Sequence, residues 1–258
     1  MKKILIGTSW KMNKTLSEAM QFCDQLKANL PTDLNPKIQP FIIPPFTAVR
    51  EVTNYIKENQ INCLTGVQNM HFADAGAFTG EISPLMVKDT GAILVEMGHS
   101  ERREFFGETD KTVNKKVHAA FKHGLTPLVC IGDSAQDKLW QVSAETVIKQ
   151  MKIALAGMNK EQVANTIIAY EPIWAIGEHG VPATAEEAET IHRKLRQALQ
   201  ESYGETVANQ VSILYGGSVN PNNCAELIQQ PNIDGLFIGR SAWQAEGFCN
   251  ILSIINQV

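Results

Sequence analysis

Three residues that can move protons or stabilise negative charge stand at the ends of apolar runs in this sequence. Lys11 comes two residues after the first such run, His99 two residues after the fourth, and Glu171 closes the sixth. A carboxylate removed from water becomes a stronger base, and lysine or neutral histidine can donate hydrogen bonds to a developing oxyanion. Together the three residue types suit removal of a proton from a carbon beside a carbonyl group.

The segment after Glu171 is apolar and predicts a lid over the site. It consists of Pro172, Ile173, Trp174, Ala175, Ile176 and Gly177, and it continues with Glu178 and His179. A closing apolar loop beside a carboxylate would exclude water and strengthen the base. Taken without this loop, Glu171 is better interpreted as a surface or salt-bridged carboxylate.

His99 precedes a segment that predicts the start of a helix at Ser100. The helix dipole would hold a histidine at this position neutral, although a simple capping role stays open. Glu101 and Arg102 are expected to form a structural ion pair. Lys11 could be a solvated surface charge or the cation that stabilises an enediolate and a phosphate.

Two glycine-containing turns predict a site for an anion. One contains Gly216, Gly217 and Ser218, and the other contains Gly239 and Arg240. Turns without bulky side chains can direct backbone N–H groups at a phosphate. These turns follow the seventh and eighth apolar runs, and Gly177 in the lid adds a third glycine.

The elements that would position these residues are eight short, nearly continuous apolar runs separated by helical patterns. Such runs are typical of parallel strands that are buried on both faces; they are Ile4–Ser9, Ile38–Ile43, Cys63–Gln68, Ala92–Met97, Thr126–Ile131, Thr166–Glu171, Val211–Gly216 and Asp234–Gly239. The predicted helices are Leu16–Leu30, Val49–Lys57, Val113–Lys122, Leu139–Leu155, Ala185–Leu199 and Trp243–Ile255. Periodicity alone fits an open or a closed sheet. The polar residues that follow so many of the strands favour a closed (β/α)₈ barrel, because its strand ends meet at one mouth. We therefore expect one α/β domain over residues 1–258.

Composition excludes several other classes of protein. The 258 residues carry a net charge of −4, with no basic stripe for nucleic acid and no apolar stretch that predicts a membrane span. The five cysteines are too scattered for a zinc site or a disulfide framework, which indicates reduced thiols in the cytoplasm. We expect no metal or other cofactor. Three histidines in helical segments are expected to be solvated, and a fourth, in the loop 69–81, to contact a partner: His118, His123, His192 and His71.

The ordered motifs of the chain resemble those of the triosephosphate isomerase family over nearly its whole length. They are Trp10–Asn13, Gly76–Glu81, Gly98–Arg103, Ala169–Gly177 and Tyr215–Val219. The resemblance implies a (β/α)₈ barrel in which Glu171 is the catalytic base and His99 and Lys11 stabilise an enediol(ate). It also implies phosphate binding by the amides of Gly177, Gly217, Ser218, Gly239 and Arg240, support from Glu101 and Cys130, and a homodimer in which Thr79 and Phe78 of the 69–81 loop approach the neighbouring site.

The chain departs from the family pattern at a few positions. Ser9 stands where the family has an active-site asparagine, Arg240 replaces a glycine, Asp133 replaces a glutamate, and the lid is about one residue longer. The smaller Ser9 would leave room for one additional CH₂OH group, since close packing makes such differences matter. The set is similar to the erythrulose-phosphate isomerase branch, which interconverts L-erythrulose 1-phosphate and D-erythrulose 4-phosphate.

Other interpretations of these departures stay open. Neutral drift would leave an ordinary triosephosphate isomerase that acts on dihydroxyacetone phosphate and glyceraldehyde 3-phosphate, and a non-catalytic sugar-phosphate binding protein is a third possibility. Ser9 could contact the substrate directly or through water. The Arg240 side chain could face the phosphate or point away from it.

Overall fold

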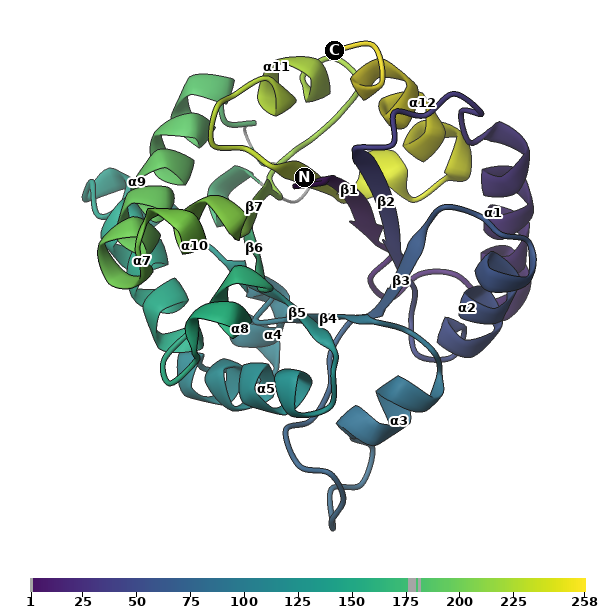
Figure 1. The fold of residues 1–258 in the computed structure, drawn as a ribbon, viewed down its shortest axis with the longest axis horizontal. Helices are drawn as coiled ribbons and strands as arrows, with labels where there is room; N and C mark the ends of the chain where they lie inside the picture. Colours follow the sequence, from purple (N-terminus) through teal and green to yellow (C-terminus); the bar gives the residue numbers. More distant parts are fainter. Residues whose placement is uncertain (1, 176–179, 181) are drawn as a thin grey trace.

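Eight parallel strands close into a barrel in the computed structural model, which describes residues 2–175, 180 and 182–258 (Figure 1). Each strand pairs with the next along the chain, and the last pairs with the first. The strands are β1 Ile4–Ser9, β2 Ile38–Ile43, β3 Leu64–Val67, β4 Leu94–Met97, β5 Thr126–Ile131, β6 Ile167–Tyr170, β7 Ser212–Tyr215 and β8 Gly235–Ile238. All eight predicted strands are present and the closed barrel is confirmed.

The helices surround the outside of the barrel (Figure 1). Those in the described part of the chain are α1 Leu16–Asn29, α2 Val49–Glu58, α3 Pro84–Asp89, α4 Ser100–Phe105, α5 Asp110–Lys122, α6 Ala135–Leu139, α7 Ser143–Ala154, α8 Lys160–Ala164, α9 Ala185–Tyr203, α10 Glu205–Gln210, α11 Cys224–Ile228 and α12 Ala245–Ile255, with 3₁₀ turns η1 Ile173–Ala175 and η2 Arg240–Ala242. The helix predicted to start at Leu139 is wrong there. The chain breaks between α6 and α7, where Gln141 adopts a left-handed φ of 60° that a continuous helix does not allow.

Local signals fix where the longer helices begin. Thr15 caps α1 by accepting a hydrogen bond from the backbone of Glu18, whose side chain accepts one from Thr15 in return. Thr184 and Glu187 form the same reciprocal pair at the start of α9. Each pair satisfies two backbone N–H groups that a helix start otherwise leaves unbonded.

The apolar core has two layers because strand side chains alternate between the two faces of the barrel. One cluster fills the barrel interior and includes Phe41 of β2 and Phe237 of β8, whose rings stack at 5.7 Å between centroids. A larger cluster lies between the strands and the helices. Gly7 of β1 makes the interior packing possible, because a Cβ there would lie 2.3 Å from the Phe41 ring.

The connection between β3 and α3 projects away from the body of the barrel (Figure 1). It carries the exposed residues Phe78 and Thr79, and the His71 ring packs between Phe72 and Phe78. Among the described helices, none combines the length and the hydropathy that a membrane span requires.

Candidate active site

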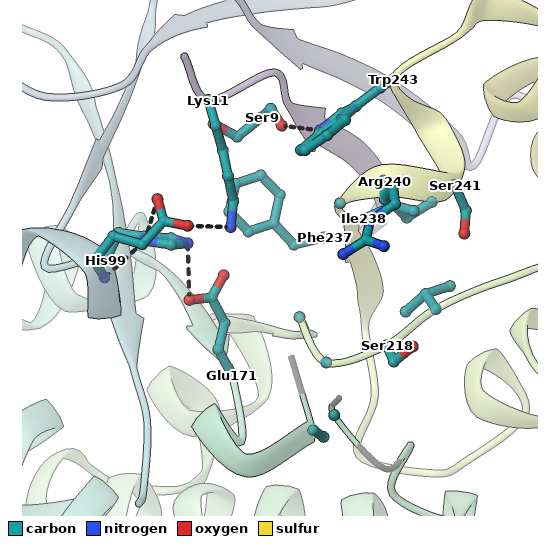
Figure 2. Close-up of a pocket in the computed structure, with 17 residues that line it drawn as sticks. Ser9, Lys11, His99, Glu171, Ser218, Phe237, Ile238, Arg240, Ser241 and Trp243 are labelled. Atoms are coloured by element: carbon teal, nitrogen blue, oxygen red, sulfur yellow. Dashed lines mark hydrogen bonds and ion pairs between the residues drawn. The ribbon is translucent and has the colours of Figure 1, made fainter. Parts of the chain in front are cut away.

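A pocket of about 430 Å³ opens among the residues that follow the carboxyl ends of the strands. Figure 2 shows Lys11, His99 and Glu171 pointing toward one another on one side of it, with Ser218 and Arg240 on the other. The structure therefore brings together the three predicted chemical residues, which come from the ends of β1, β4 and β6. Ser9, Glu101, Gly217 and Gly239 also line this pocket.

Glu171 is the most deeply buried carboxylate of this pocket, with 4% of its surface exposed. Its Oε2 atom lies 3.4 Å from Nε2 of His99 and makes no hydrogen bond within the described residues. Burial raises the pKa of Glu171 to about 8, partly opposed by the positive charge of Lys11 and reinforced by nearby carboxylates. A buried carboxylate with an unused oxygen is suited to accept a proton from a bound molecule.

His99 is the N-cap residue of α4, and the helix starts at Ser100 as predicted. Its Nδ1 accepts a hydrogen bond from the backbone N–H of Glu101 at 3.2 Å. Because Nδ1 is the acceptor, a neutral ring carries its proton on Nε2, the atom that faces Glu171. Burial, together with the charge of Lys11, lowers the pKa of His99 to about 4, so the ring is a neutral donor at pH 7.

Lys11 is held in an unusual backbone conformation with φ of 54°. Gln68 donates a hydrogen bond to the Lys11 carbonyl at 2.8 Å, and the Lys11 ammonium donates one to Glu101 Oε1 at 2.6 Å. Burial alone would lower the pKa of Lys11, but the Glu101 hydrogen bond and the charges of Glu171 and Glu96 raise it. The ammonium therefore stays charged and points into the pocket.

The ion pair predicted between Glu101 and Arg102 is wrong. Glu101 pairs with Lys11, whereas Arg102 faces Glu108 with 3.5 Å between Nε and Oε2. Consecutive helical residues point in different directions, so neighbours in the sequence rarely pair. Glu101 thereby links the end of β1 to α4.

The two glycine turns line the opposite side of the pocket. Gly216 lies against Glu171: a Cβ there would be 2.6 Å from Cγ of Glu171. Gly217, Ser218 and Gly239 present backbone to the same space. The Arg240 guanidinium also points into the pocket (Figure 2). Of the two directions that the sequence left open for this side chain, the structure shows the inward one. It adds a positive charge opposite Lys11.

The first part of the predicted lid is tied to Asp133, which is fully buried. The Asp133 carboxylate accepts hydrogen bonds from Trp174 Nε1 at 3.0 Å, Tyr170 Oη at 2.9 Å and Ser143 Oγ at 2.6 Å. Ala175 lines the pocket. Pro172 and Ile173 precede Trp174, and Ile176, Gly177, Glu178 and His179 lie outside the described residues.

The sequence interpretation missed Glu96. This residue of β4 is 2% exposed, and its Oε2 accepts a hydrogen bond from Ser9 Oγ at 2.8 Å. Burial raises the pKa of Glu96 to about 7. The alternation of inward and outward residues could have found it, because Leu94 faces the barrel interior and Glu96 is two residues further along the strand.

The remaining predicted residues are not among those that line the pocket. Cys130 belongs to the barrel interior, where burial and the charges of Glu171 and Glu96 raise the pKa of its thiol. His192 is fully buried, so its predicted solvation is wrong: it packs beside Tyr170 and Tyr215, and burial lowers its pKa to about 4. His118 is exposed and His123 contacts Asp74.

No group of three or more His, Cys, Asp or Glu side chains within residues 2–175, 180 and 182–258 has the arrangement of a metal site. The five cysteines are buried and free.

Comparison with known proteins identifies relatives over almost the full length of the chain. The family model described as triosephosphate isomerase matches residues 4–255. A protein of Rhizobium etli named L-erythrulose-1-phosphate isomerase is 51% identical over 254 residues, which cover 98% of this chain and 92% of the relative. Two proteins with the same name are each 52% identical to this chain. The match to the Brucella suis protein covers 98% of this chain and 96% of that protein. The match to the Rhizobium meliloti protein covers 96% of this chain and 94% of that protein.

Proposed function

Since this chain belongs to the triosephosphate isomerase family and is a sugar-phosphate isomerase, we propose that it interconverts L-erythrulose 1-phosphate and D-erythrulose 4-phosphate. The relatives that carry the name of the four-carbon substrate are about half identical to it across nearly their whole length. The departures at Ser9 and Arg240 support the same substrate, because both lie in the pocket.

In the proposed reaction Glu171 takes the proton from carbon 3 of L-erythrulose 1-phosphate. The electrons of that bond form the double bond of a cis-enediol(ate), whose oxygens are stabilised by the Nε2 proton of His99 and the ammonium of Lys11. Glu171 then returns a proton to carbon 2. Through His99, the oxygen on carbon 2 gains a proton and the oxygen on carbon 3 loses one, so the carbonyl group now lies on carbon 3. Numbered from its other end, this product is D-erythrulose 4-phosphate.

The observation that carries the proposal is the 3.4 Å approach of His99 Nε2 to Glu171 Oε2 inside a pocket with Lys11. A base and a neutral hydrogen-bond donor that face the same space can act on adjacent carbon and oxygen atoms of one substrate. Burial supplies a base whose pKa is about 8, close to the working range of a general base at neutral pH.

For the phosphate we propose the glycine turns on the other side of the pocket. The backbone N–H groups of Gly217, Ser218, Gly239 and Arg240 would bind its oxygens, with Gly177 of the lid as a further donor. The Arg240 guanidinium would add a charge-assisted contact, which is stronger than a contact between neutral groups. Gly217, Ser218, Gly239 and Arg240 all line the pocket, which supports this placement of the phosphate.

We further propose that the protein is a cytoplasmic homodimer that serves erythritol-type catabolism. The projecting 69–81 loop carries Phe78, which is 47% exposed, and the pocket side of the molecule carries Met12, which is 96% exposed. The resemblance to a family of homodimers supports this proposal, and these exposed apolar side chains are compatible with it. Thr79 and Phe78 would then approach the site of the neighbouring subunit.

Steady-state kinetics on both substrates test the proposed reaction. We expect kcat/KM for L-erythrulose 1-phosphate to exceed that for glyceraldehyde 3-phosphate; the reverse order would assign the chain to ordinary triose phosphate isomerisation. Incubation with substrate in D₂O provides the control for catalysis, because a protein that only binds sugar phosphates would leave the substrate without deuterium.

A further inference from the structure

Glu96 is a buried carboxylate that the proposed proton transfer does not use. It lies on the inward face of β4, two residues beyond Leu94, and the single hydrogen bond of its side chain among the described residues is the one from Ser9 Oγ. A carboxylate enclosed in a protein interior costs several kcal/mol unless it is well paired. A hydroxyl group compensates less than a cation would, so packing does not explain an acidic residue at this position.

The position of Glu96 relative to the pocket suggests what it contacts. Glu96 lines a second cavity of about 450 Å³, whereas the glycine turns line only the first. Ser9, Lys11, His99 and Glu101 line both cavities. The second cavity therefore continues the catalytic pocket at the end that lies away from the phosphate turns.

A four-carbon ketose phosphate would extend toward this end. With its phosphate at Gly217 and Ser218 and its reacting carbons beside Glu171, its remaining CH₂OH group would point toward Ser9 and Glu96. A triose phosphate has no carbon beyond its two reacting carbons at this end. The two substrates thus differ at the place where the chain carries the Ser9–Glu96 pair.

We propose that the Glu96 carboxyl group binds the terminal hydroxyl of the four-carbon substrate and so determines specificity, with Ser9 as the residue that positions it. Ser9 engages Oε2 of Glu96 and leaves Oε1 for the substrate. The main chain of Ser9 is itself fixed, because Trp243 Nε1 donates a hydrogen bond to its carbonyl at 3.0 Å (Figure 2). This inference rests on the proposed function and names the group that recognises its substrate.

Glu96→Leu tests the inference because it keeps the approximate volume and removes the acceptor. We expect kcat/KM for L-erythrulose 1-phosphate to fall roughly 10- to 100-fold more than kcat/KM for glyceraldehyde 3-phosphate, as for loss of a hydrogen bond to a charged group. Glu96→Gln keeps an acceptor of the same shape and should restore much of the lost discrimination. Ser9→Asn, which enlarges the neighbouring side chain, should also harm the four-carbon substrate more.

Asp234→Asn is the matched control. Asp234 is a partly buried carboxylate next to β8 that pairs with Lys2 and Arg196, away from the pocket-lining residues. Its replacement should change both substrates by the same factor. Equal losses for both substrates in Glu96→Leu would overturn the role of Glu96 while leaving the proposed function intact. Wild-type protein without turnover of L-erythrulose 1-phosphate would overturn both.

Discussion

Nε2 of His99 and Oε2 of Glu171 face each other at 3.4 Å across the floor of the pocket. The two atoms have complementary roles: a neutral imidazole presents its proton there, and a buried carboxylate presents an unused oxygen. Both residues are enclosed, so water competes weakly for either group. A substrate that enters this space meets a proton acceptor and a proton donor on neighbouring atoms.

Glu171→Gln should reduce kcat by a factor of roughly 10² to 10⁴, the usual contribution of a general base. Glutamine has nearly the same shape but does not accept a proton from carbon. Deuterium incorporation from D₂O should fall in parallel with turnover. Near-normal turnover in a correctly folded variant would refute the assignment of Glu171 as the base.

Gly216→Ala should lower kcat more than it raises KM. The added methyl group would lie 2.6 Å from Cγ of Glu171 and would displace the carboxylate from its position beside His99. Small displacements of a catalytic group can cost on the order of 10² in rate. Thermal unfolding of the variant distinguishes this effect from misfolding. A variant with unchanged kcat would show that the base tolerates this displacement.

The stability of the protein should fall as the pH rises from about 6.5 to about 9. Burial raises the pKa of Glu96 from 4.5 to about 7 and that of Glu171 from 4.5 to about 8. In this range the folded protein holds protons that the unfolded chain has released, so increasing pH favours unfolding. Below about pH 6.5 the buried, neutral His99 and His192 act in the opposite direction, because burial lowers the pKa of each to about 4. Glu96→Gln should flatten the curve and be more stable than wild type near pH 8.5 by on the order of 2 kcal/mol. Urea unfolding at several pH values measures this, and parallel curves for the two proteins would contradict it.

Asp133→Asn should destabilise the protein by about 1–3 kcal/mol and slow turnover. Asp133 accepts hydrogen bonds from Ser143, Tyr170 and Trp174, whereas the NH₂ group of asparagine donates and leaves at least one of these donors without an acceptor. Trp174→Phe removes one donor and keeps the ring, so it isolates the contribution of the lid. If Asp133→Asn unfolds at the wild-type urea concentration, the three hydrogen bonds do not anchor the lid.

The sequence predicted the strands well because they are buried on both faces and are therefore continuously apolar, and the polar residues after so many strands favoured their closure into a barrel. The strand ends also predict that Lys11, His99 and Glu171 lie near one another. The Ser9–Glu96 and Lys11–Glu101 contacts could not be predicted in this way, because they join residues separated by 87 and 90 positions. Such contacts depend on how two strands and a helix come together in space.

The errors have equally specific causes. His192 lies in a helical segment among polar residues, and its burial against Tyr170 and Tyr215 follows from which helix face meets the barrel. The Glu101–Arg102 pair was predicted from adjacency in the sequence, although helix geometry separates neighbouring side chains. Glu96 lies within a run that is otherwise apolar, and that run as a whole predicts only a strand. An acidic residue that interrupts such a run can contribute chemistry from the barrel interior.

The left-handed backbone conformation of Lys11 lowers the stability of the protein, whereas its side chain serves the proposed catalysis. A residue with a Cβ pays roughly 1–2 kcal/mol in this conformation, whereas glycine adopts it freely. A laboratory selection for thermal tolerance alone would therefore favour glycine at position 11 and discard the ammonium group. Descendants of this chain selected for robustness alone would therefore lose activity through this position, unless the selection also demanded catalysis.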